Sequence, residues 1–442
     1  MTPLRACRIL GISVLLALVP AGSAAEGDWS QWRGPRQNGS SPALSLPARL
    51  GPENLAWSTA LPGKAGSTPV LSGDRIFLTS PDAEKNLLLL CLDRKSGKEL
   101  WRRTVGIGDR EVGRNNMCAP SPVVDSERVV VLFGTGDFAA FDLDGKPLWQ
   151  RNLGKEYGNF AIMWLYGASP LLHEGRLYLP VLQRDEMPQD YPRFDGKPTR
   201  ESFVLCVDPA TGKDLWRHVR KTDSTKESGE SYATPVAFKG PNGPELVVVG
   251  GDHVSGHRFG DGGEIWRARL YEKRDDWYRI VTSPVVAGGF VLASGPKGQP
   301  VVAFRGGGSG DVTQTHRAWE FRDTPTDWST PCLYQDHVFV LDGQKRVLSK
   351  LNPKDGSKVW SGKVPGSGPI WGSPSAADGK LYCHDENGTV FALSAGEQFE
   401  VLGSHAFQGE SPCKGSVALA DGQVLVRTAT SLHAFSGNLP RN

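Results

Sequence analysis

Little in the composition of this 442-residue chain favours binding to nucleic acid or to a membrane. The formal net charge is only +2, and beyond the N-terminal stretch no block of like charge is longer than three residues. A nearly neutral protein has no overall field that attracts phosphate backbones or anionic lipids. The apolar run at residues 9–19 is shorter than the ~20 residues that span a membrane. We therefore expect no nucleic-acid partner and no membrane span.

The N-terminus instead predicts export. Arg5 and Arg8 precede the apolar run and small residues follow it at 23–25, which is the pattern of a cleaved secretory signal. No cysteine stands at the expected cleavage point to carry a lipid anchor, so we expect a periplasmic or secreted protein, and a monomer. The predicted parts are a signal peptide (1–25), an N-terminal leader (26–53), a main domain (54–437) and a C-terminal tail (438–442).

Common motifs of catalysis and metal binding are also missing. The chain has seven cysteines, but none are adjacent, and none show the spacing of a haem or zinc site. Cys91 and Cys206 occupy equivalent positions in separate repeats, which predicts buried apolar residues rather than a disulfide. A disulfide among the other four cysteines that follow the signal stays open. We predict no metal site, and the sequence identifies no catalytic residue.

Two local patterns imitate functional sites. His253 and His257 are four residues apart, as zinc ligands on a helix are, but they flank a predicted strand. The glycine-rich run 306–310 resembles a phosphate-binding loop, yet no Lys-Ser or Lys-Thr pair and no helix follow it. We interpret the histidines as surface or core residues and the glycine run as an enlarged turn.

What the sequence does contain is an eightfold repeat. Seven units open on a small residue followed by proline: Thr68, Ser121, Ser169, Thr234, Ser283, Thr330 and Ser373. The eighth opener, Ser416-Val417, lacks the proline but keeps an Ala-Asp-Gly turn after it. Apolar strands and glycine-containing turns follow each opener, and the openers are about 43 to 65 residues apart, near the period of propeller blades. This pattern predicts an all-β fold, an eight-bladed β-propeller with four antiparallel strands in each blade.

The last repeat predicts how the ring closes. Residues 417–420, 423–428 and 432–435 supply three strands, and the outer strand of that blade is missing. The Asn-Leu-Ala-Trp sequence at 54–57 matches the Leu-x-Trp pieces that close other units. We therefore expect an N-terminal strand at 55–59 to complete the eighth blade and hide an edge that would otherwise pair with another chain.

Most units end in an acidic-glycine turn that leads to a tryptophan. These tryptophans are Trp101, Trp149, Trp216, Trp266 and Trp360. A tryptophan at the same place in the last strand of each blade is expected to pack between neighbouring blades and to anchor the turn before it. We interpret the series as structural core that carries no chemistry.

Loop lengths distinguish the two faces of the predicted propeller, in which strands a to d run from the centre to the rim. The a–b and c–d turns are mostly minimal, whereas blade three carries a b–c insertion at 183–202. Long d–a connections are expected at 103–120, 152–168, 219–233 and 270–282. Long connections at one end of a rigid scaffold are where binding usually resides, so the d–a/b–c face is the predicted functional face.

Large aromatic and charged side chains occupy these connections just before the innermost strands. We expect them to ring the mouth of the central channel and to bind a ligand or partner. The alternative is that the aromatic residues only plug the mouth. The candidate binding residues are Arg114, Asn115, Trp164, Tyr166, Tyr232, Arg279, Trp328, Trp371 and Lys414. Their neighbours in the same connections include Asn116, Glu230, Trp277, Tyr278 and Asp327.

Units such as Ser-Phe-Val-Leu-Cys-Val-Asp-Pro-Ala-Thr-Gly-Lys-Asp-Leu-Trp at 202–216 resemble pyrroloquinoline-quinone-like propeller repeats. The resemblance covers nearly all of the chain after the signal, and residues 28–39 resemble the leader of secreted members. Repeats of this kind build quinoprotein alcohol dehydrogenases and BamB-like assembly factors, both of which are eight-bladed. The resemblance is therefore a strong indication of fold and a weak indication of function.

The resemblance implies two functions. In the dehydrogenases, the quinone lies between a tryptophan and a disulfide of adjacent cysteines, beside a calcium ion. Trp328 or Trp371 resembles that tryptophan, but the chain has no adjacent cysteines. We therefore expect a non-enzymatic propeller, without a cofactor, that binds an envelope or extracellular protein or polymer. The alternative is a pyrroloquinoline-quinone-dependent dehydrogenase, with calcium, whose cofactor site has diverged.

Overall fold

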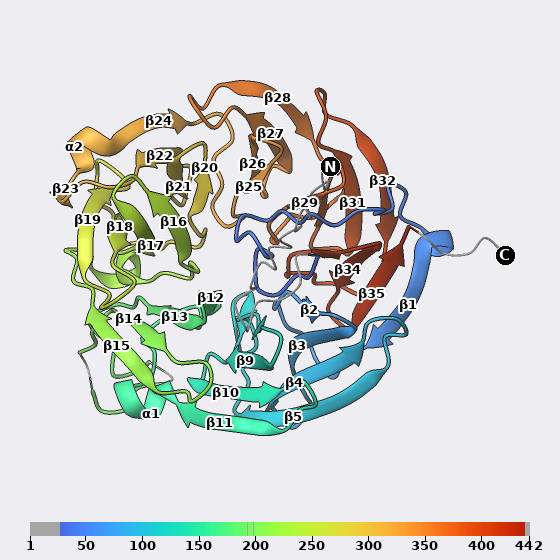
Figure 1. The fold of residues 1–442 in the computed structure, drawn as a ribbon, viewed down its shortest axis with the longest axis horizontal. Helices are drawn as coiled ribbons and strands as arrows, with labels where there is room; N and C mark the ends of the chain where they lie inside the picture. Colours follow the sequence, from blue (N-terminus) through green and yellow to red (C-terminus); the bar gives the residue numbers. More distant parts are fainter. Residues whose placement is uncertain (1–26, 192, 198, 438–442) are drawn as a thin grey trace, which may run out of the picture.

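The computed structural model describes residues 27–191, 193–197 and 199–437; the predicted signal and tail lie outside these residues. The described chain passes once around a ring of eight blades (Figure 1). Each blade contains four antiparallel strands, which follow one another along the chain except in blade eight, where β1 is the outer strand. A short fifth strand, β23, pairs parallel with the outer strand of blade four, and the few helices are one or two turns long. The predicted all-β, eight-bladed propeller is confirmed.

Each blade runs from an inner strand to an outer strand in chain order. Blade one contains β2 (Val70–Ser72), β3 (Arg75–Pro81), β4 (Asn86–Asp93) and β5 (Glu99–Ile107). Blade two contains β8 (Val123–Val124), β9 (Arg128–Leu132), β10 (Asp137–Asp142) and β11 (Pro147–Asn152). Blades three and four contain β12 (Leu171–His173), β13 (Arg176–Val181), β14 (Phe203–Val207), β15 (Asp214–Val219), and β16 (Val236–Gly240), β17 (Gly243–Gly250), β18 (His253–His257), β19 (Glu264–Arg269).

The second half of the ring repeats this order. Blades five and six contain β20 (Val285–Ala287), β21 (Phe290–Ser294), β22 (Val301–Arg305), β24 (Arg317–Phe321), and β25 (Cys332–Tyr334), β26 (His337–Asp342), β27 (Val347–Leu351), β28 (Lys358–Lys363). Blade seven contains β29 (Ser375–Ala377), β30 (Lys380–His384), β31 (Thr389–Ser394) and β32 (Val401–Ala406). Blade eight contains β33 (Ala418–Ala420), β34 (Gln423–Arg427) and β35 (Ser431–Ser436), and its outer strand is β1 (Leu55–Ala60).

Short elements occupy the connections between these strands. They are η1 (Pro52–Asn54), β6 (Glu111–Val112), β7 (Asn115–Asn116), α1 (Leu153–Tyr157), η2 (Lys226–Gly229), β23 (Gly310–Asp311) and α2 (Thr313–His316). The d–a connection predicted at 103–120 begins too early in the sequence, because strand β5 continues to Ile107. The glycine run 306–310 lies in the connection from β22 to β24, as the predicted enlarged turn.

Burial explains why the middle strands read as continuous apolar runs. Strands β3 and β4 are buried at nearly every position, because both faces of a blade pack against neighbouring blades. The outer strand β5 instead alternates between exposed and partly buried residues. The hydrophobic core therefore lies between successive blades rather than in one central cluster.

The predicted closure of the ring is also confirmed. Strand β1 pairs antiparallel with β35, with Trp57 opposite Ala434, so the last sheet has the order β1-β35-β34-β33. The outer edge of β35 is thus covered by a segment from the other end of the chain, which removes an exposed edge.

The eight openers form a closed ring of hydrogen bonds, which we call the hydroxyl collar. The backbone N–H of each opener donates to the side-chain hydroxyl of the next opener, with N···O distances of 2.8 to 3.1 Å. The last bond runs from Ser416 N to Thr68 Oγ1 and joins blade eight to blade one. The openers are serine or threonine because the collar uses the hydroxyl, and Ser416 keeps that group although no proline follows it.

Replacing Ser416 by alanine is expected to lower the free energy of unfolding by about 1–3 kcal/mol, because the buried N–H of Ser373 then lacks its acceptor. Chemical denaturation measures this loss. The matched control Ser416→Thr keeps the hydroxyl and is expected to unfold close to the wild type. Equal stability of the alanine variant and the wild type would show that the collar bond contributes nothing.

Four of the five predicted tryptophans join neighbouring blades. The indole N–H of Trp101, Trp149, Trp216 and Trp360 donates to a backbone carbonyl in the next blade, at 2.8 to 3.1 Å. Trp57 and Trp319, which the series did not include, make the same contact. Trp57 is buried, and the other five rings are partly exposed.

Trp266 differs from the rest of the series. Its side chain is fully buried, and its indole N–H donates to Glu245 Oε2, at 2.7 Å, within its own blade. The next blade has no acidic-glycine turn to receive it, because β23 lies there and pairs parallel with β19. Trp266 therefore makes no hydrogen bond to a turn of the next blade, but it packs, as expected, in a buried cluster formed by residues of blades four and five.

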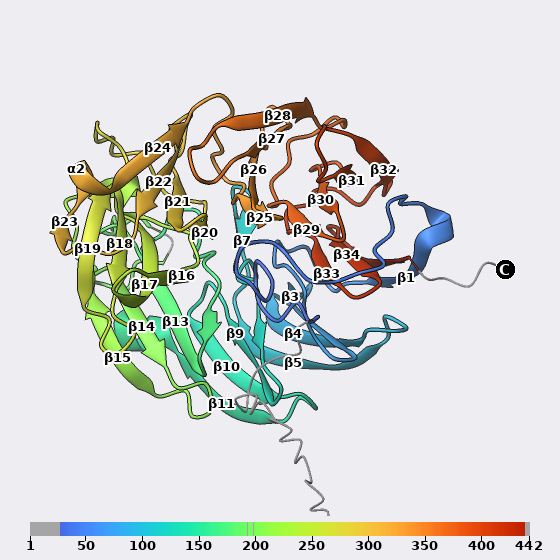
Figure 2. The ribbon, with the colours of Figure 1, turned by 45° about the horizontal axis from the view of Figure 1, so that its top comes forward.

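The N-terminal residues 27–50, which we call the leader segment, lie over the centre of the ring (the blue coil in Figures 1 and 2). Carbonyl groups of Trp29, Ser30, Asn38 and Gly39 accept hydrogen bonds from inner strands of blades one, two, six and seven. Other contacts reach the a–b turns, including Leu44 O with Gly422 N. The leader segment therefore closes the channel on the a–b face.

Arg33 fixes this segment in the channel. Its side chain is buried, and its guanidinium group donates to Pro374 O and Pro331 O, both at 2.9 Å. Burial lowers the pKa of Arg33 to about 10, so the group stays charged at neutral pH. The two carbonyl groups belong to different blades, so one side chain ties the leader segment to both.

All six described cysteines are buried and unpaired. The expectation for Cys91 and Cys206 is confirmed, and no disulfide forms among the other four. Burial raises the pKa of Cys206 to about 11 and that of Cys91 to about 12. The described thiols therefore pack as small apolar side chains.

Candidate functional site

A pocket of about 530 Å³ lies at the mouth of the channel on the d–a face. All eight d–a connections contribute residues to it. The predicted residues that line it are Arg114, Asn115, Trp164, Tyr232, Arg279, Trp328, Trp371 and Lys414. Sequence reasoning missed five collar residues and Trp32 of the leader segment, which also line this mouth pocket. The structure thus brings eight of the nine predicted residues together, and their role in binding stays a prediction.

Tyr166 is the exception. Its side chain is fully buried, its hydroxyl donates to Pro180 O at 2.9 Å, and its ring packs on Phe160. Leu165, between Trp164 and Tyr166, has a φ of +67°, so the chain bends and the two rings do not point the same way. The expectation that Tyr166 lies at the mouth is wrong.

A two-stranded hairpin, β6–β7, carries Arg114 and Asn115 over the pocket. The guanidinium carbon of Arg114 lies 4.2 Å from the ring centroid of Trp371, which comes from the connection before blade seven. The tip residue Gly113 has a φ of +60°, and a Cβ there would lie 2.8 Å from the ring of Trp164. The hairpin therefore needs glycine at this point to approach Trp164 while it reaches toward blade seven.

A buried polar network supports the wall beside Trp164. The Tyr232 hydroxyl donates to Glu230 Oε2 at 3.1 Å and accepts from the backbone N–H of Trp164 at 3.2 Å. Glu230 is fully buried, and Arg184 Nε donates to its other oxygen. Burial raises the pKa of Glu230 to about 7, against the opposing effect of Arg184. This carboxylate holds the wall in position and does not line the pocket.

A second buried carboxylate fixes the other side of the same wall. The indole N–H of Trp164 donates to Glu227 Oε1 at 2.8 Å, and Arg279 Nε lies 3.6 Å from that oxygen. The Trp164 side chain is held at both its backbone and its ring, yet it stays 38% exposed. An exposed ring held in one orientation is suited to contact a ligand at low entropic cost.

The mouth pocket contains cations and no lining carboxylate. Arg114 and Arg279 each lie about 3.5 Å from one carboxylate oxygen, which is longer than an ordinary hydrogen bond. Lys414 makes no hydrogen bond or ion pair within the described part of the chain, and burial lowers its pKa. Most of the N–H donors on these three side chains therefore make no hydrogen bond within the described residues.

One pair of tryptophans agrees with the alternative interpretation, in which the aromatic residues only plug the mouth of the channel. Trp328 and Trp371 pack on each other, with ring centroids 4.2 Å apart, and the Trp328 indole N–H donates to Ile370 O at 2.7 Å. Both rings are partly buried by this contact. Trp164 offers more ring surface to the pocket than either of them.

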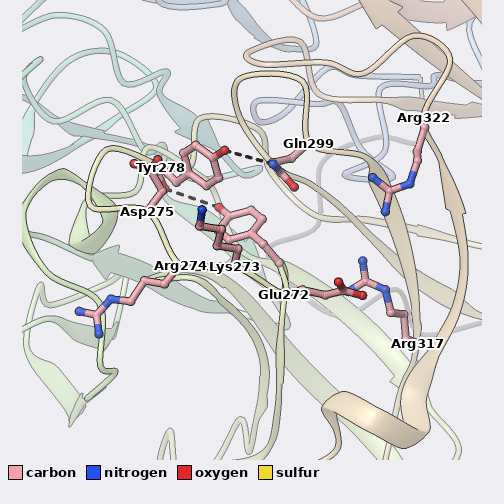
Figure 3. A pocket seen from close by; sticks show the side chains of 9 residues that line it. Glu272, Lys273, Arg274, Asp275, Tyr278, Gln299, Arg317 and Arg322 are labelled. Atoms are coloured by element: carbon pink, nitrogen blue, oxygen red, sulfur yellow. Dashed lines mark hydrogen bonds between the residues drawn. The ribbon is translucent and has the colours of Figure 1, made fainter.

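A smaller pocket of about 270 Å³ lies beside blades four and five (Figure 3). Tyr278, one of the expected mouth neighbours, lines this pocket instead, and its hydroxyl accepts from Gln299 at 3.2 Å. Figure 3 shows Glu272 pointing toward Arg317, so side chains of both charges line this pocket. Two of its cations, Arg317 and Arg322, are already paired with Glu320, which makes this pocket a weaker candidate than the mouth pocket.

The patterns that imitate metal sites are structural. His253 and His257 are buried in β18, and burial lowers their pKa to about 4 and about 3, so both are neutral at pH 7. Among the described residues, no group of three or more His, Cys, Asp or Glu is placed to hold a metal ion. None of the described helices is long and apolar enough to cross a membrane.

The fold and the repeats define the class of this chain: a propeller of pyrroloquinoline-quinone-like repeats. The sequence profile of the family described as outer membrane protein assembly factor BamB matches residues 52–185, 195–320 and 311–435. The chain therefore belongs to this family. Its resemblance to quinoprotein and BamB-like propellers, expected from the repeats, is confirmed.

Curated relatives include two enzymes. The chain is 26% identical to a polyvinylalcohol dehydrogenase of Sphingopyxis sp. (strain 113P3) over 207 residues, which are 46% of this chain and 30% of that protein. A polyvinylalcohol dehydrogenase of Pseudomonas sp. is 24% identical over 233 residues, or 52% and 31% of the two chains. The chain thus matches less than a third of the length of either relative.

Solved structures show the same fold in both kinds of protein. The quinohemoprotein alcohol dehydrogenase of Comamonas testosteroni aligns with a TM-score of 0.67 at 14% identity, covering 95% of this chain and 82% of that one. BamB of Moraxella catarrhalis aligns with a TM-score of 0.59 at 14% identity, covering 86% and 99%. Since the fold is common to an enzyme and an assembly factor, the function has to be argued from the site.

The mouth pocket does not fit a quinone that is held with calcium. Calcium takes six to eight oxygen ligands, several of them carboxylates, and no aspartate or glutamate lines the pocket. The six described cysteines are unpaired, so no disulfide is present to clamp a flat ring. The indole rings and cations would suit an acidic aromatic molecule, but the donor set for the metal is missing from the lining.

Proposed function

We propose that the chain is an exported, non-enzymatic β-propeller that binds an envelope or extracellular protein or polymer through the d–a/b–c face. The observation that carries this proposal is the convergence of all eight d–a connections on one pocket lined by aromatic rings, cations and hydroxyl groups. The secretory pattern at 1–25 supports export.

The lining offers no assembled catalytic group. Nucleophilic catalysis by a hydroxyl needs an adjacent base within hydrogen-bond reach. Within the described residues, the lining collar hydroxyls accept only backbone N–H groups, and none is bonded to a histidine, lysine or carboxylate. Binding is therefore the function that this geometry supports best.

A quinone-dependent dehydrogenase is the second candidate, favoured by the two polyvinylalcohol dehydrogenases among the relatives. The test is to add pyrroloquinoline quinone and calcium to the purified protein and to follow dye-linked oxidation of simple alcohols and of polyvinyl alcohol. We expect no alcohol-dependent reduction of the dye. A stoichiometric change in quinone absorbance together with dye reduction would defeat the binding proposal.

A further inference from the structure

The hydroxyl collar has donors that the fold does not use. A serine or threonine hydroxyl can accept hydrogen bonds and also donates one. Each collar hydroxyl accepts the N–H of the preceding opener, and the described residues provide no acceptor for the eight hydroxyl protons. All eight residues are more than nine-tenths buried. Each hydroxyl therefore has a proton that is available to an acceptor inside the channel.

Five of these hydroxyl groups line the same pocket as the three cations. The lining members of the collar are Ser121, Ser169, Thr234, Ser373 and Ser416. The cations come from three different connections, as described above, and Lys414 makes neither a hydrogen bond nor an ion pair within the described residues. The lining therefore combines hydroxyl donors with cationic donors. Carboxylates outside the lining approach Arg114 and Arg279, at 3.5 and 3.6 Å, so Lys414 is the cation with the fewest competing partners.

We propose that the mouth pocket receives an oxyanion, a carboxylate or phosphate group carried on the end of the bound ligand, with Lys414 and the lining collar hydroxyls as its donors. The proposal rests on the proposed function and names the ligand chemistry of that site. Hydrogen bonds from charged donors to oxyanions are short and strong, and they favour acceptor-rich groups over neutral ones. The exposed ring of Trp164 suits a flat or apolar body attached to the oxyanion.

Small aromatic acids provide defined probes. Benzene-1,3,5-tricarboxylate and phenyl phosphate represent the two oxyanions, and benzamide is the neutral control; titration calorimetry measures each affinity. We expect at least one oxyanion to bind and benzamide not to bind. Lys414→Gln should weaken binding by about tenfold or more, because a charge-assisted bond is lost. Lys354→Gln, in the exposed c–d turn of blade six on the opposite face, should leave the affinity unchanged.

The collar offers a second pair of matched variants. Ser169 lines the pocket and Ser283 does not, although both accept an N–H from the preceding opener. Both alanine variants should lose similar stability, but only Ser169→Ala should weaken binding of the probe, by a few-fold. Equal affinities for Ser169→Ala, Ser283→Ala and the wild type would remove the collar from the site and overturn the proposal.

The two proposals fail in different ways. Binding of benzamide as tightly as the acids, or unchanged binding by Lys414→Gln, would overturn the oxyanion assignment and leave the mouth pocket as a binding site. No binding of any probe, with ordered water alone on the collar in a crystal structure, would also overturn it. A partner that contacts only the a–b face would instead overturn the proposed function.

Discussion

A variant that lacks residues 27–59 is expected to aggregate and to lose cooperative unfolding. The deletion removes β1, which leaves the outer edge of β35 unpaired and free to pair with another chain. It also removes the leader segment, including Arg33 and its bonds to two blades. Thermal unfolding and size-exclusion chromatography of the purified variant measure both effects.

A milder variant separates the two contributions. Arg33→Met keeps a long side chain but removes the donors to Pro331 O and Pro374 O. We expect it to stay monomeric and to melt at a lower temperature than the wild type, because the closing strand remains. A soluble deletion product with an unchanged melting temperature would show that the ring closes in another way.

Gly212→Ala is expected to lower the free energy of unfolding by about 2–5 kcal/mol. Gly212 has a φ of +70°, where a Cβ costs roughly 1–2 kcal/mol, and that Cβ would lie 2.5 Å from the ring of Trp149. Forcing an extra atom into a packed contact adds about 1–3 kcal/mol. Denaturant unfolding gives the total.

Gly175 provides the matched control. It also has a φ of +70°, but a Cβ there would have nothing within 4 Å. Gly175→Ala should therefore show only the free-energy cost of placing alanine at this backbone conformation. The larger loss of stability in Gly212→Ala then measures the cost of disturbing the contact between Trp149 and the next blade. If both variants lost the same stability, the tryptophan contacts would not hold neighbouring blades together.

The repeated openers and the displaced strand predicted at 55–59 were enough to predict the propeller and its closure, because strand order and closure follow from a periodic pattern. The hydroxyl collar could have been predicted from the same pattern, because every opener is serine or threonine. The sequence analysis interpreted the openers only as small residues and did not use their hydroxyl groups. The leader segment was not predictable as a channel plug. Its contacts join residues about 40 to 380 positions apart, and no local periodicity encodes them.

The convergence of most candidate residues on one pocket was predictable for a geometric reason. In a propeller, every d–a connection ends beside the central channel, so residues such as Tyr232 and Lys414 converge whatever path their loops take. The loop paths themselves were not predictable. The left-handed conformation of Leu165 turns Tyr166 into the core, and the β6–β7 hairpin carries Arg114 to Trp371.

The most direct test of binding through the d–a/b–c face is site-specific photo-crosslinking in envelope preparations from the source cells. A photoreactive phenylalanine replaces Trp164 at the mouth pocket or Lys354 on the opposite face. We expect a discrete crosslinked product from position 164 and none from position 354. A product from position 354 alone, or none from either position, would contradict the account.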